Sequence, residues 1–451
     1  MARWSFPRIR RGALPRSLAD LASPLYLLQL RLGLSWLAWP LLGTAAAAYR
    51  RTVLRHTAVV AIVGSYGKTT TTRAVAAALG LAEPPVSARN SWSAVALRVL
   101  RAHPGRPLCV EVGISRAGQM RRYGRTLRPD VVVLTAIGGE HYRSLGSLEA
   151  IAAEKAEMLR ALRPGGVAVV NGDDERVRQI AAAHGGRVVT CGLGAGSEVR
   201  AMRLVPDWPR GSTLEVALPG YQGEARLALF GEPGARAALA AIAVARELGV
   251  APSVALARIV AVVPSTGRLQ PVPLASGVAL LRDDYKSGIE TIEVCLAAFA
   301  AVPARRRVLV VGDVEEPRRS QHALTRELGR RGAAVASRVL YVGHHGADLR
   351  AGTRQAGLPR QAVTEHRDVH EVAATLRSEL RSGDVVLIKG RHNQKLARVA
   401  MLLGGIEITC RLRSCPAVGT LCDFCPLAVE TERTAGGAGA RGVAAGTSNR
   451  E

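Results

Sequence analysis

Short apolar runs alternate with longer amphipathic stretches along most of the chain. Each run is rich in valine or isoleucine and ends in glycine or polar residues, which is typical of a buried strand. The first runs occupy residues 58–63, 108–113, 131–135 and 165–171. An alanine-rich helix begins at about Lys68, and Ser147 is the expected N-cap of another that continues to about Leu162. From His56 onward we therefore predict an α/β fold in which helices cover both faces of mostly parallel sheets.

A glycine-spaced loop separates the first apolar run from its helix. The chain has Gly-Ser-Tyr-Gly-Lys-Thr-Thr from Gly64 to Thr70. Here backbone N–H groups and the helix dipole attract an anion, Lys68 would reach the outer phosphates of a nucleotide, and Thr69 would offer its hydroxyl to Mg²⁺. The P-loop pattern has a further glycine where this chain has Ile62, and the alternative is a simple glycine turn. The strand–loop–helix context favours a nucleotide phosphate site.

Further polar side chains are expected near the same edge of the sheet. Glu111 lies at the end of the second apolar run, where a buried acid needs a cation, either Mg²⁺ near the loop or a neighbouring arginine. His141 follows the third run, at the carboxyl edge where such folds bind ligands, although a single histidine is more often structural. Lys155 and several glutamates lie on the next helix, a pattern that is usually typical of a solvated face.

The composition limits the number of domains and the class of partner. A length of 451 residues suggests two or three domains, and 48% hydrophobic residues are enough for large cores. The net charge of +25 comes from arginine, because subtracting five lysines from 61 basic residues leaves 56 arginines. The arginines are scattered, and so no nucleic-acid partner is predicted. We interpret the lysines as positions that require a compact or deprotonatable amine. They are Lys68, Lys155, Lys286, Lys389 and Lys395.

The seven cysteines divide into two groups. Three stand alone in apolar surroundings and are predicted to be small buried residues, namely Cys109, Cys191 and Cys295. Four lie within sixteen residues near the C-terminus, namely Cys410, Cys415, Cys422 and Cys425. These four thiols would bind Zn²⁺ or an iron–sulfur cluster, although their spacing matches no common zinc ribbon, and the alternative is free or redox-active thiols. No cleavable signal peptide is evident, and a reducing, cytoplasmic compartment is expected.

The first 55 residues are strongly basic, with nine arginines against one acid, Asp20. An uncharged stretch from Leu32 to Tyr49 is flanked by arginines, but its eighteen residues are at the short limit for a membrane span and include Pro40. Three interpretations stay open: a membrane span, an interfacial helix pair on anionic lipid, and a helix docked on the soluble body. The expected location is the cytoplasm, with peripheral or anchored contact at the cytoplasmic face of the inner membrane.

Nine sequence blocks occur in a fixed order along residues 56–405. Those in the first half are Gly64-Ser-Tyr-Gly-Lys-Thr-Thr, Glu111-Val-Gly, Thr135-Ala-Ile-Gly-Gly-Glu-His141, Ser147-Leu-Glu-Ala-Ile-Ala-Ala-Glu-Lys155 and Asn171-Gly-Asp-Asp. Those in the second half are Thr266-Gly-Arg268-Leu, Asp283-Asp-Tyr, Gly312-Asp-Val-Glu-Glu and Gly383-Asp-Val-Val-Leu-Ile-Lys-Gly390. Together they resemble the Mur ligase family, whose members are ATP-dependent amide ligases of cell-wall peptide assembly. The second set most resembles the member that adds D-alanyl-D-alanine to the muramoyl tripeptide.

The resemblance implies a P-loop central domain, a Rossmann-like C-terminal domain and a chemical mechanism. ATP would phosphorylate a substrate carboxylate, an amine would attack the acyl phosphate, and loss of phosphate would leave an amide. Charge on the transferring phosphoryl group would be neutralised by the loop, a lysine and Mg²⁺. The residues expected to hold the phosphates are Gly64, Ser65, Gly67, Lys68, Thr69 and Thr70.

The same resemblance assigns further roles by motif position. Thr69, Glu111 and His141 would serve the metal ions directly or through water. Lys155 matches a lysine that is carbamoylated in many family members, and with Lys68 and His141 it completes the expected catalytic set. Positions that close on ATP and its ribose correspond to Arg268 and Asp284, and Lys389 would lie near the acyl phosphate or the incoming peptide.

Departures from the family pattern concern the substrates. The segment Gly231-Glu-Pro-Gly-Ala-Arg-Ala237 lacks a histidine and two asparagines of the family's adenine side, Lys286 stands where an asparagine is usual, and Arg391 replaces a serine. Residues 1–55 cannot form the N-terminal domain that usually holds the UDP-sugar. A carboxylate acceptor that is lipid-linked or polymeric would suit a membrane-associated N-terminus.

Five segments are therefore expected along the chain. They are a basic N-terminal segment (1–55), a central ATPase domain (56–262), a C-terminal domain (263–409), a four-cysteine segment (410–430) and a disordered tail (431–451). The predicted function is an ATP-dependent amide ligase of cell-wall or envelope biosynthesis, with a carboxylate acceptor such as a muramoyl peptide and an amine such as D-alanyl-D-alanine. The alternatives are a lipid-linked or poly-amino-acid acceptor, and a degenerate nucleotide-binding scaffold subunit.

Overall fold

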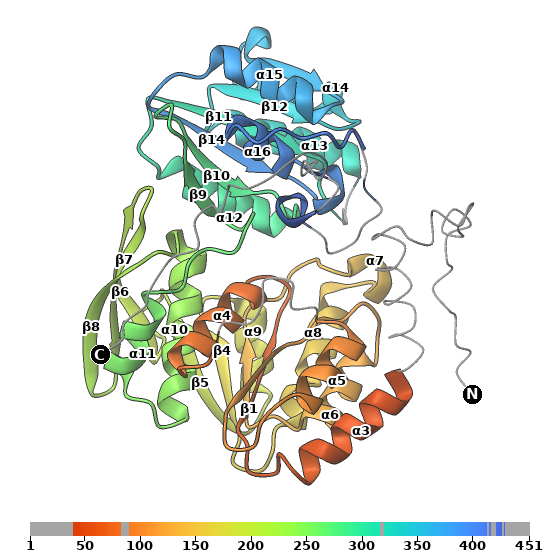
Figure 1. Ribbon diagram of the computed structural model, residues 1–451, viewed down its shortest axis with the longest axis vertical. Helices are drawn as coiled ribbons and strands as arrows, with labels where there is room; N and C mark the ends of the chain where they lie inside the picture. Colours follow the sequence, from red (N-terminus) through yellow and green to blue (C-terminus); the bar gives the residue numbers. More distant parts are fainter. Residues whose placement is uncertain are drawn as a thin grey trace, which may run out of the picture.

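The computed structural model describes residues 39–82, 90–315, 320–412, 415, 421–425 and 428. Two α/β units are stacked along the long axis of the molecule, and the chain passes from the lower unit into the upper one between β8 and β9 (Figure 1). One unit has an eight-stranded sheet and the other has a six-stranded sheet. The predicted α/β class with mostly parallel sheets is confirmed.

The sheet of the first unit has the strand order β2-β1-β3-β4-β5-β6-β7-β8. Neighbouring strands are parallel from β2 to β6, and β7 and β8 add an antiparallel hairpin. The strands are β1 Val59–Val63, β2 Leu108–Glu111, β3 Val131–Leu134, β4 Val167–Asn171, β5 Arg187–Gly192, β6 Val199–Asp207, β7 Gly211–Leu218 and β8 Tyr221–Leu227. The first four coincide with the apolar runs from which strands were predicted.

Helices cover both faces of this sheet (Figure 1). On β1, Val60 and Ile62 pack toward α4, α10 and α11, whereas Val59, Ala61 and Val63 pack toward α3, α5 and α6. Successive side chains of a strand point to opposite faces, and here both faces are buried. The helices are α3 Trp39–Arg51, α4 Lys68–Ala78, α5 Trp92–Leu100, α6 Gln119–Leu127, α7 Tyr142–Leu145, α8 Leu148–Ala156, η1 Leu159–Ala161, α9 Glu175–Ala182, α10 Gly231–Glu247 and α11 Pro252–Ile259.

Helix α8 begins as predicted but is shorter than expected and more buried. The Ser147 hydroxyl accepts the backbone N–H of Ala150 at 3.0 Å, which confirms the N-cap. The helix ends at Ala156, and one 3₁₀ turn follows. The expectation of a solvated face is wrong for Glu154 and Lys155, which are buried. The carboxylate of Glu154 accepts two backbone N–H groups at the start of α6 and so acts as a cap for that helix.

Helix α3 docks on the first unit. Ala46 of α3 and Leu54 just beyond it are fully buried in the core that α5 and α6 share. Within the described part of the chain, no helix has both the length and the apolar character needed to cross a bilayer. The described part of the uncharged N-terminal stretch packs against the first unit, as the third interpretation expects. Residues 32–38 of that stretch lie outside the described residues.

The second unit has the strand order β13-β12-β11-β14-β10-β9, and only β9 is antiparallel to its neighbour. The strands are β9 Gln270–Pro273, β10 Ala279–Asp283, β11 Arg306–Gly312, β12 Arg338–Val342, β13 Val363–His366 and β14 Asp384–Lys389. The helices are α12 Ile289–Ala300, α13 Gln321–Ala333, α14 Gly346–Gln355, η2 Arg360–Ala362, α15 Val369–Glu379, η3 His392–Gln394, α16 Ala397–Leu403 and η4 Cys422–Phe424.

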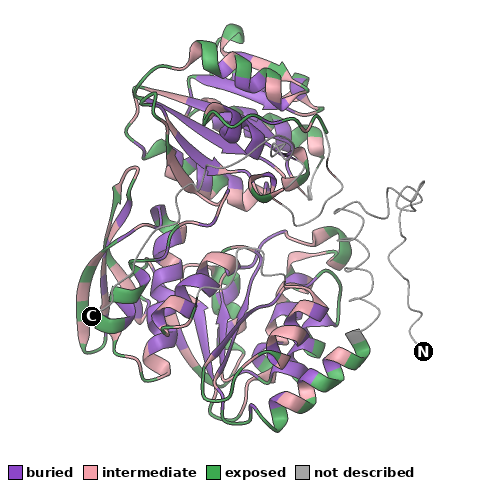
Figure 2. Ribbon diagram, viewed as in Figure 1, coloured by how far each residue is buried: buried purple, intermediate pink, exposed green. Residues whose placement is uncertain are grey.

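The core of the second unit also lies on both faces of its sheet. On β11, Leu309 and Val311 pack toward α12, α13 and α14, whereas Val308 and Val310 pack toward α15 and α16. Figure 2 shows the central strands of both sheets buried, the β6–β8 end of the first sheet partly exposed, and the outer faces of the helices exposed. Because the central strands of both sheets are parallel and covered by helices, their carboxyl ends are the natural place for a ligand site.

Candidate active site

A cavity of about 2030 Å³ lies between the two units. Pockets for one small ligand usually have about 300–1,000 Å³, so this cavity has room for a nucleotide and further substrates. Its lining from the first unit includes Lys68, Thr69, Thr70, Glu111 and His141. Its lining from the second unit includes Arg268, Asp283, Tyr285, Lys286 and Lys389. The structure therefore brings most of the predicted site residues together.

The glycine-spaced loop is shaped by its contact with the end of β3. A Cβ atom on Gly64 would lie 1.9 Å from Thr135 Oγ1, so only glycine fits there. Ser65 N–H donates to the Ala136 carbonyl at 2.8 Å, and Gly67, at φ 84°, is the residue from which α4 begins. The first N–H groups of α4 have no partner within the helix, and the residues that carry them, Lys68, Thr69 and Thr70, line the cavity. This arrangement suits a phosphate.

Lys68 and Lys286 bind the two oxygens of one carboxylate. Lys68 Nζ lies 3.0 Å from Glu140 Oε2, and Lys286 Nζ, from the second unit, lies 3.1 Å from Glu140 Oε1. Burial alone would raise the pKa of Glu140, but the two lysines hold that pKa far below its usual value. Lys68 Nζ also donates to the carbonyl oxygens of Gly64 and Ser65. The chain thus holds two cations around one anionic position at the mouth of the phosphate loop.

Glu111 forms the centre of an oxygen-rich group beside the loop. It ends β2, directly alongside Ile62 of β1. The Thr69 hydroxyl donates to Glu111 Oε2 at 2.9 Å, and the Asn90 amide donates to Glu111 Oε1 at 2.8 Å. In the described part of the chain no arginine pairs with Glu111, which sets aside the alternative of a neighbouring arginine. A hydroxyl and a carboxylate at a phosphate loop fit Mg²⁺.

His141 lies at the carboxyl end of β3, as predicted. Burial, together with nearby lysines, lowers the pKa of His141 to about 4. The imidazole is therefore neutral at physiological pH, which is the form that binds a metal ion. Its Nε2 lies 3.9 Å from Glu140 Oε1.

Lys155 is buried on α8, with 2% of its surface exposed. Burial, and then the charge of Lys68, lowers the pKa of Lys155 to about 7. Among the described residues, none forms a hydrogen bond or an ion pair with Lys155 Nζ. A lysine in this state is partly neutral at neutral pH, which is the form that reacts with CO₂.

The second unit supplies the other side of the cavity. Lys389 Nζ lies 2.5 Å from Asp283 Oδ2 and 2.7 Å from the carbonyl oxygen of Lys286. The guanidinium of Arg268 stacks on the Tyr285 ring, 4.3 Å from its centroid. Asp284 does not line the cavity: its side chain is buried and pairs with Arg282 at 3.1 Å. The contact of Asp284 with a ribose stays a prediction.

Several polar residues of the site were not predicted from the sequence. No sequence pattern pointed to Asn90 or Glu290. In the structure, Glu290 Oε1 accepts the N–H of Gly139 at 2.9 Å and so joins the two units. Glu140 precedes His141 in a recognised block, and its role follows only from its two lysine partners. Lys286 could have been predicted as a site residue from the sequence, because it is one of the chain's five lysines.

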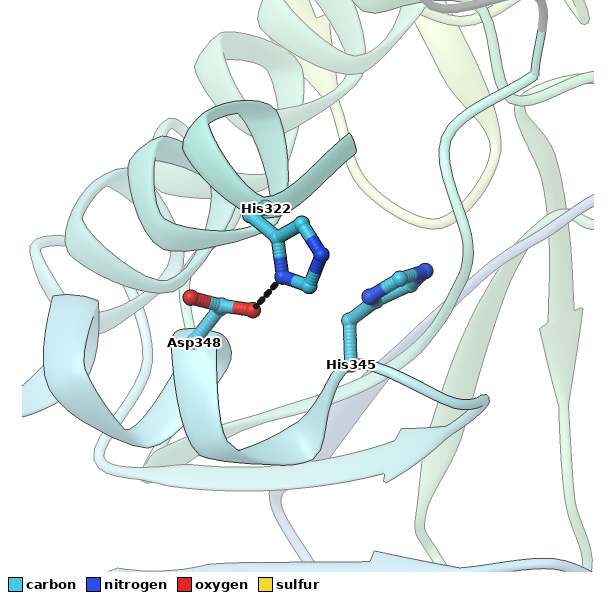
Figure 3. A group of neighbouring side chains, drawn as sticks. All are labelled: His322, His345 and Asp348. Carbon is cyan, nitrogen blue, oxygen red and sulfur yellow. Dashed lines mark hydrogen bonds and ion pairs between the residues drawn. The ribbon is translucent and has the colours of Figure 1, made fainter. Parts of the chain in front are cut away.

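Two groups of metal-ligand type lie outside the cavity. No three sulfur atoms of the four C-terminal cysteines lie within 4.8 Å of one another. Among the described residues, one group of three side chains meets that distance, formed by His322, His345 and Asp348 (Figure 3). His322 Nδ1 lies 2.6 Å from Asp348 Oδ2, and Arg326 lies 3.3 Å from the other oxygen. Ion pairs therefore already satisfy Asp348.

Comparison with known proteins identifies the family. The profile of the Mur ligase middle domain matches residues 62–245, and that of the Mur ligase, glutamate ligase domain matches residues 267–392. The chain is 31% identical over 396 residues to the UDP-N-acetylmuramoyl-tripeptide–D-alanyl-D-alanine ligase of Mycobacterium bovis, which covers 80% of this chain and 75% of that protein. It is 25% identical over 353 residues to the enzyme of the same name from Bacillus subtilis, covering 76% and 75%.

Solved structures share the fold. MurF from Acinetobacter baumannii superposes with a TM-score of 0.71 at 22% identity, over 81% of this chain and 80% of that one. MurF ligase from Thermotoga maritima in complex with ADP gives a TM-score of 0.71 at 21% identity, over 82% and 84%. The predicted resemblance is confirmed: the chain belongs to the Mur ligase family and is an ATP-dependent ligase that forms carbon–nitrogen bonds.

Proposed function

We propose that this ligase joins a muramoyl peptide carboxylate to the amine of D-alanyl-D-alanine in cell-wall assembly. These substrates are the ones for which its relatives are named. The observation that carries the proposal is the pair of lysines, Lys68 and Lys286, around one anionic position beside the Thr69–Glu111 group. Phosphoryl transfer requires positive charge around the transferred phosphoryl group. That charge must lie where the two substrates meet.

The reaction divides into two balanced steps. A carboxylate oxygen attacks the γ-phosphorus of ATP, the bond to ADP breaks, and an acyl phosphate forms. The amine nitrogen then attacks the acyl carbon, loses a proton, and expels phosphate with the oxygen that came from the carboxylate. Mg²⁺ bound near Thr69, Glu111 and His141 would offset negative charge on the phosphates.

Particular residues have stated roles in this scheme. The N-terminus of α4 and Lys68 hold the outer phosphates of ATP. When a phosphate takes the position of the Glu140 carboxylate, Lys286 brings a second cation from the opposite unit. Lys389 stands behind Lys286 and fixes its backbone carbonyl. A carbamoylated Lys155 would supply a carboxylate in place of an amine, which suits a second metal ion.

The N-terminal segment supports a finer proposal about location. Eight arginines in the first 55 residues, besides the buried Arg50, favour contact with an anionic membrane surface at the cytoplasmic face. Co-sedimentation with vesicles of anionic lipid should retain the protein at low salt and release it at high salt. Binding that is equal on neutral vesicles would contradict an electrostatic contact.

Phosphate release tests the proposed reaction. The protein should release phosphate from ATP only when a muramoyl tripeptide and D-alanyl-D-alanine are both present. Ammonia and glutamate are tested as alternative amines in place of D-alanyl-D-alanine. Lys68→Ala should lower turnover at least about a hundredfold, because it removes the charge that meets the phosphates. If the protein binds ATP but stays silent with every acceptor and amine, the scaffold alternative is favoured and the proposed ligase reaction is wrong.

A further inference from the structure

The described residues of the four-cysteine segment contact the second unit around the start of α16. The N–H of Thr409 donates to the carbonyl of Ala428 at 3.2 Å, which brings the two ends of the segment together. The N–H of Cys415 donates to the carbonyl of Asn393 at 3.3 Å. The side chain of Cys422 is buried in a small apolar cluster that Cys410 and Cys425 also contact. All four cysteines therefore lie near one part of the same domain.

Two buried cations lie among these thiols. Arg398 is 2% exposed, and its Nη2 lies 3.2 Å from Cys410 Sγ. Its Nη1 donates to the carbonyls of Cys410 and Leu412, whereas its buried Nε has no hydrogen-bond partner in the described part of the chain. In that part no carboxylate pairs with Arg398. A buried guanidinium is costly unless negative charge lies nearby, and thiolates would provide it.

The second cation is Lys395, which is 3% exposed. Burial lowers the pKa of Lys395, and the thiols of Cys422, Cys415 and Cys425 lie near enough for their charge to oppose that shift. The other four lysines of this arginine-rich chain belong to the candidate active site. By the same logic, the fifth marks a second site that requires a compact cation.

The segment also forms part of the wall of the interdomain cavity. Leu421 and Phe424, on either side of the Cys422 turn, line the cavity. Between them, Asp423 pairs with Arg282 of β10, with oxygen–nitrogen distances of 2.5 and 3.1 Å. Arg282 in turn binds Asp284. The cysteine turn is thus tied to the strand end that precedes Tyr285.

We propose that Cys410, Cys415, Cys422 and Cys425 hold a metal centre through four thiolates, either Zn²⁺ or an iron–sulfur cluster, and that this centre fastens Leu421 and Phe424 to the cavity wall. Each thiol gives up its proton on binding. Four thiolates outweigh the charge of Zn²⁺ by two, and Arg398 with Lys395 offset that excess. The sulfur atoms lie near the same cations without converging, so metal binding draws the segment together.

Metal analysis tests the site without any ligase assay. Anaerobically purified protein should contain about one zinc ion, or about four irons with matching acid-labile sulfide, per chain. Cys422→Ser with Cys425→Ser should lower that content to background. Cys109→Ser is the matched control, because it removes a buried lone thiol and should leave the metal content unchanged. Wild-type protein that contains neither metal, or a metal that the double variant retains, would overturn the proposal.

A second measurement tests the fastening of the wall, and this part rests on the proposed nucleotide site. Asp423→Asn should keep the metal content of the wild type and weaken ADP binding several-fold, because the link to Arg282 is lost. The double cysteine variant should weaken ADP binding at least as much. Unchanged ADP affinity in both variants would overturn the fastening role. If the wild-type protein has the metal and binds ADP but shows no ligase turnover, that result would count only against the proposed reaction.

Discussion

Lys155 is a buried amine whose pKa is lowered to about 7 by burial and by Lys68. An amine is protonated below its pKa and neutral above it, so the neutral form grows as pH rises through about 7. We predict that ¹³C-labelled bicarbonate gives a carbamate carbon signal in NMR that is weak at pH 6 and strong at pH 8. The signal should disappear in Lys155→Ala.

Lys286→Arg is the matched control for the carbamate signal. Burial acts to lower the pKa of Lys286, but Glu140 and Glu315 raise it above its ordinary value, so this lysine stays charged and does not react with CO₂. The control variant should keep the full signal. A signal that survives in Lys155→Ala would show that another amine is modified, and a signal that falls as pH rises would contradict carbamate formation on a neutral amine.

Gly64 is the position in the phosphate loop where a side chain is least tolerated. A Cβ there would overlap Thr135 Oγ1, which itself donates to the Tyr66 carbonyl at 2.6 Å. Gly64→Ala should cost about 2 kcal/mol in the loop conformation, which corresponds to an ATP affinity about thirtyfold weaker. Gly196→Ala is the control, because a Cβ at that glycine meets nothing within 4 Å. Equal ATP affinity in the two variants would refute this account of the loop.

Single residues were predictable where one local rule decides the structure. The Ser147 cap and the placement of Glu111 and His141 at the sheet edge needed only a strand, a turn or a helix start. Burial of Lys155 could not be predicted in this way, because its helix packs through a face that carries charge. Burial of a helix residue depends on which residues of other elements pack against it. The periodicity of the helix's own sequence does not identify those residues.

At the scale of elements, α3 is held on the first unit by Arg50. The guanidinium pairs with Asp130 at 2.9 Å and donates to the carbonyls of Leu127 and Arg128, and it is nearly fully buried. Arg50→Ala leaves these acceptors and Asp130 without their partner. We predict a loss of about 3 kcal/mol in the free energy of unfolding, measured by urea denaturation.

Arg51 provides a matched control for Arg50. It is the next residue on α3, it is exposed, and it makes one hydrogen bond to the carbonyl of Arg125. Arg51→Ala should change the free energy of unfolding by less than about 0.5 kcal/mol. If the two variants are equally stable, α3 is not held by the buried guanidinium. A docked α3 could not be predicted from the sequence, because length and hydropathy alone left three arrangements open.

At the scale of the whole molecule, the two units meet through Lys286–Glu140 and through Glu290–Gly139. Lys286 is partly exposed, so its ion pair contributes at most about 1 kcal/mol to closure. Lys286→Ala should raise the ratio of open to closed forms about fivefold, which small-angle X-ray scattering would record as a larger radius of gyration. Arg187→Ala removes one exposed charge far from this contact and should leave the radius unchanged.

The sequence blocks predicted both units and most of the nucleotide side of the cavity. They could not predict which residues meet across the cavity, because Glu140 and Lys286 are 146 positions apart and come together only when two separate sheets pack. The acceptor side depends on those contacts. The proposed acceptor is therefore the one for which the relatives are named.

The fate of one oxygen atom shows whether the reaction passes through an acyl phosphate. If the ligase forms an acyl phosphate, a muramoyl tripeptide labelled with ¹⁸O in the reacting carboxylate should transfer one labelled oxygen to each phosphate released with D-alanyl-D-alanine. Mass spectrometry of the phosphate reads this out. Lys68→Ala should release no labelled phosphate above background. Unlabelled phosphate from the wild-type protein, released at the same rate as the amide forms, would contradict the account.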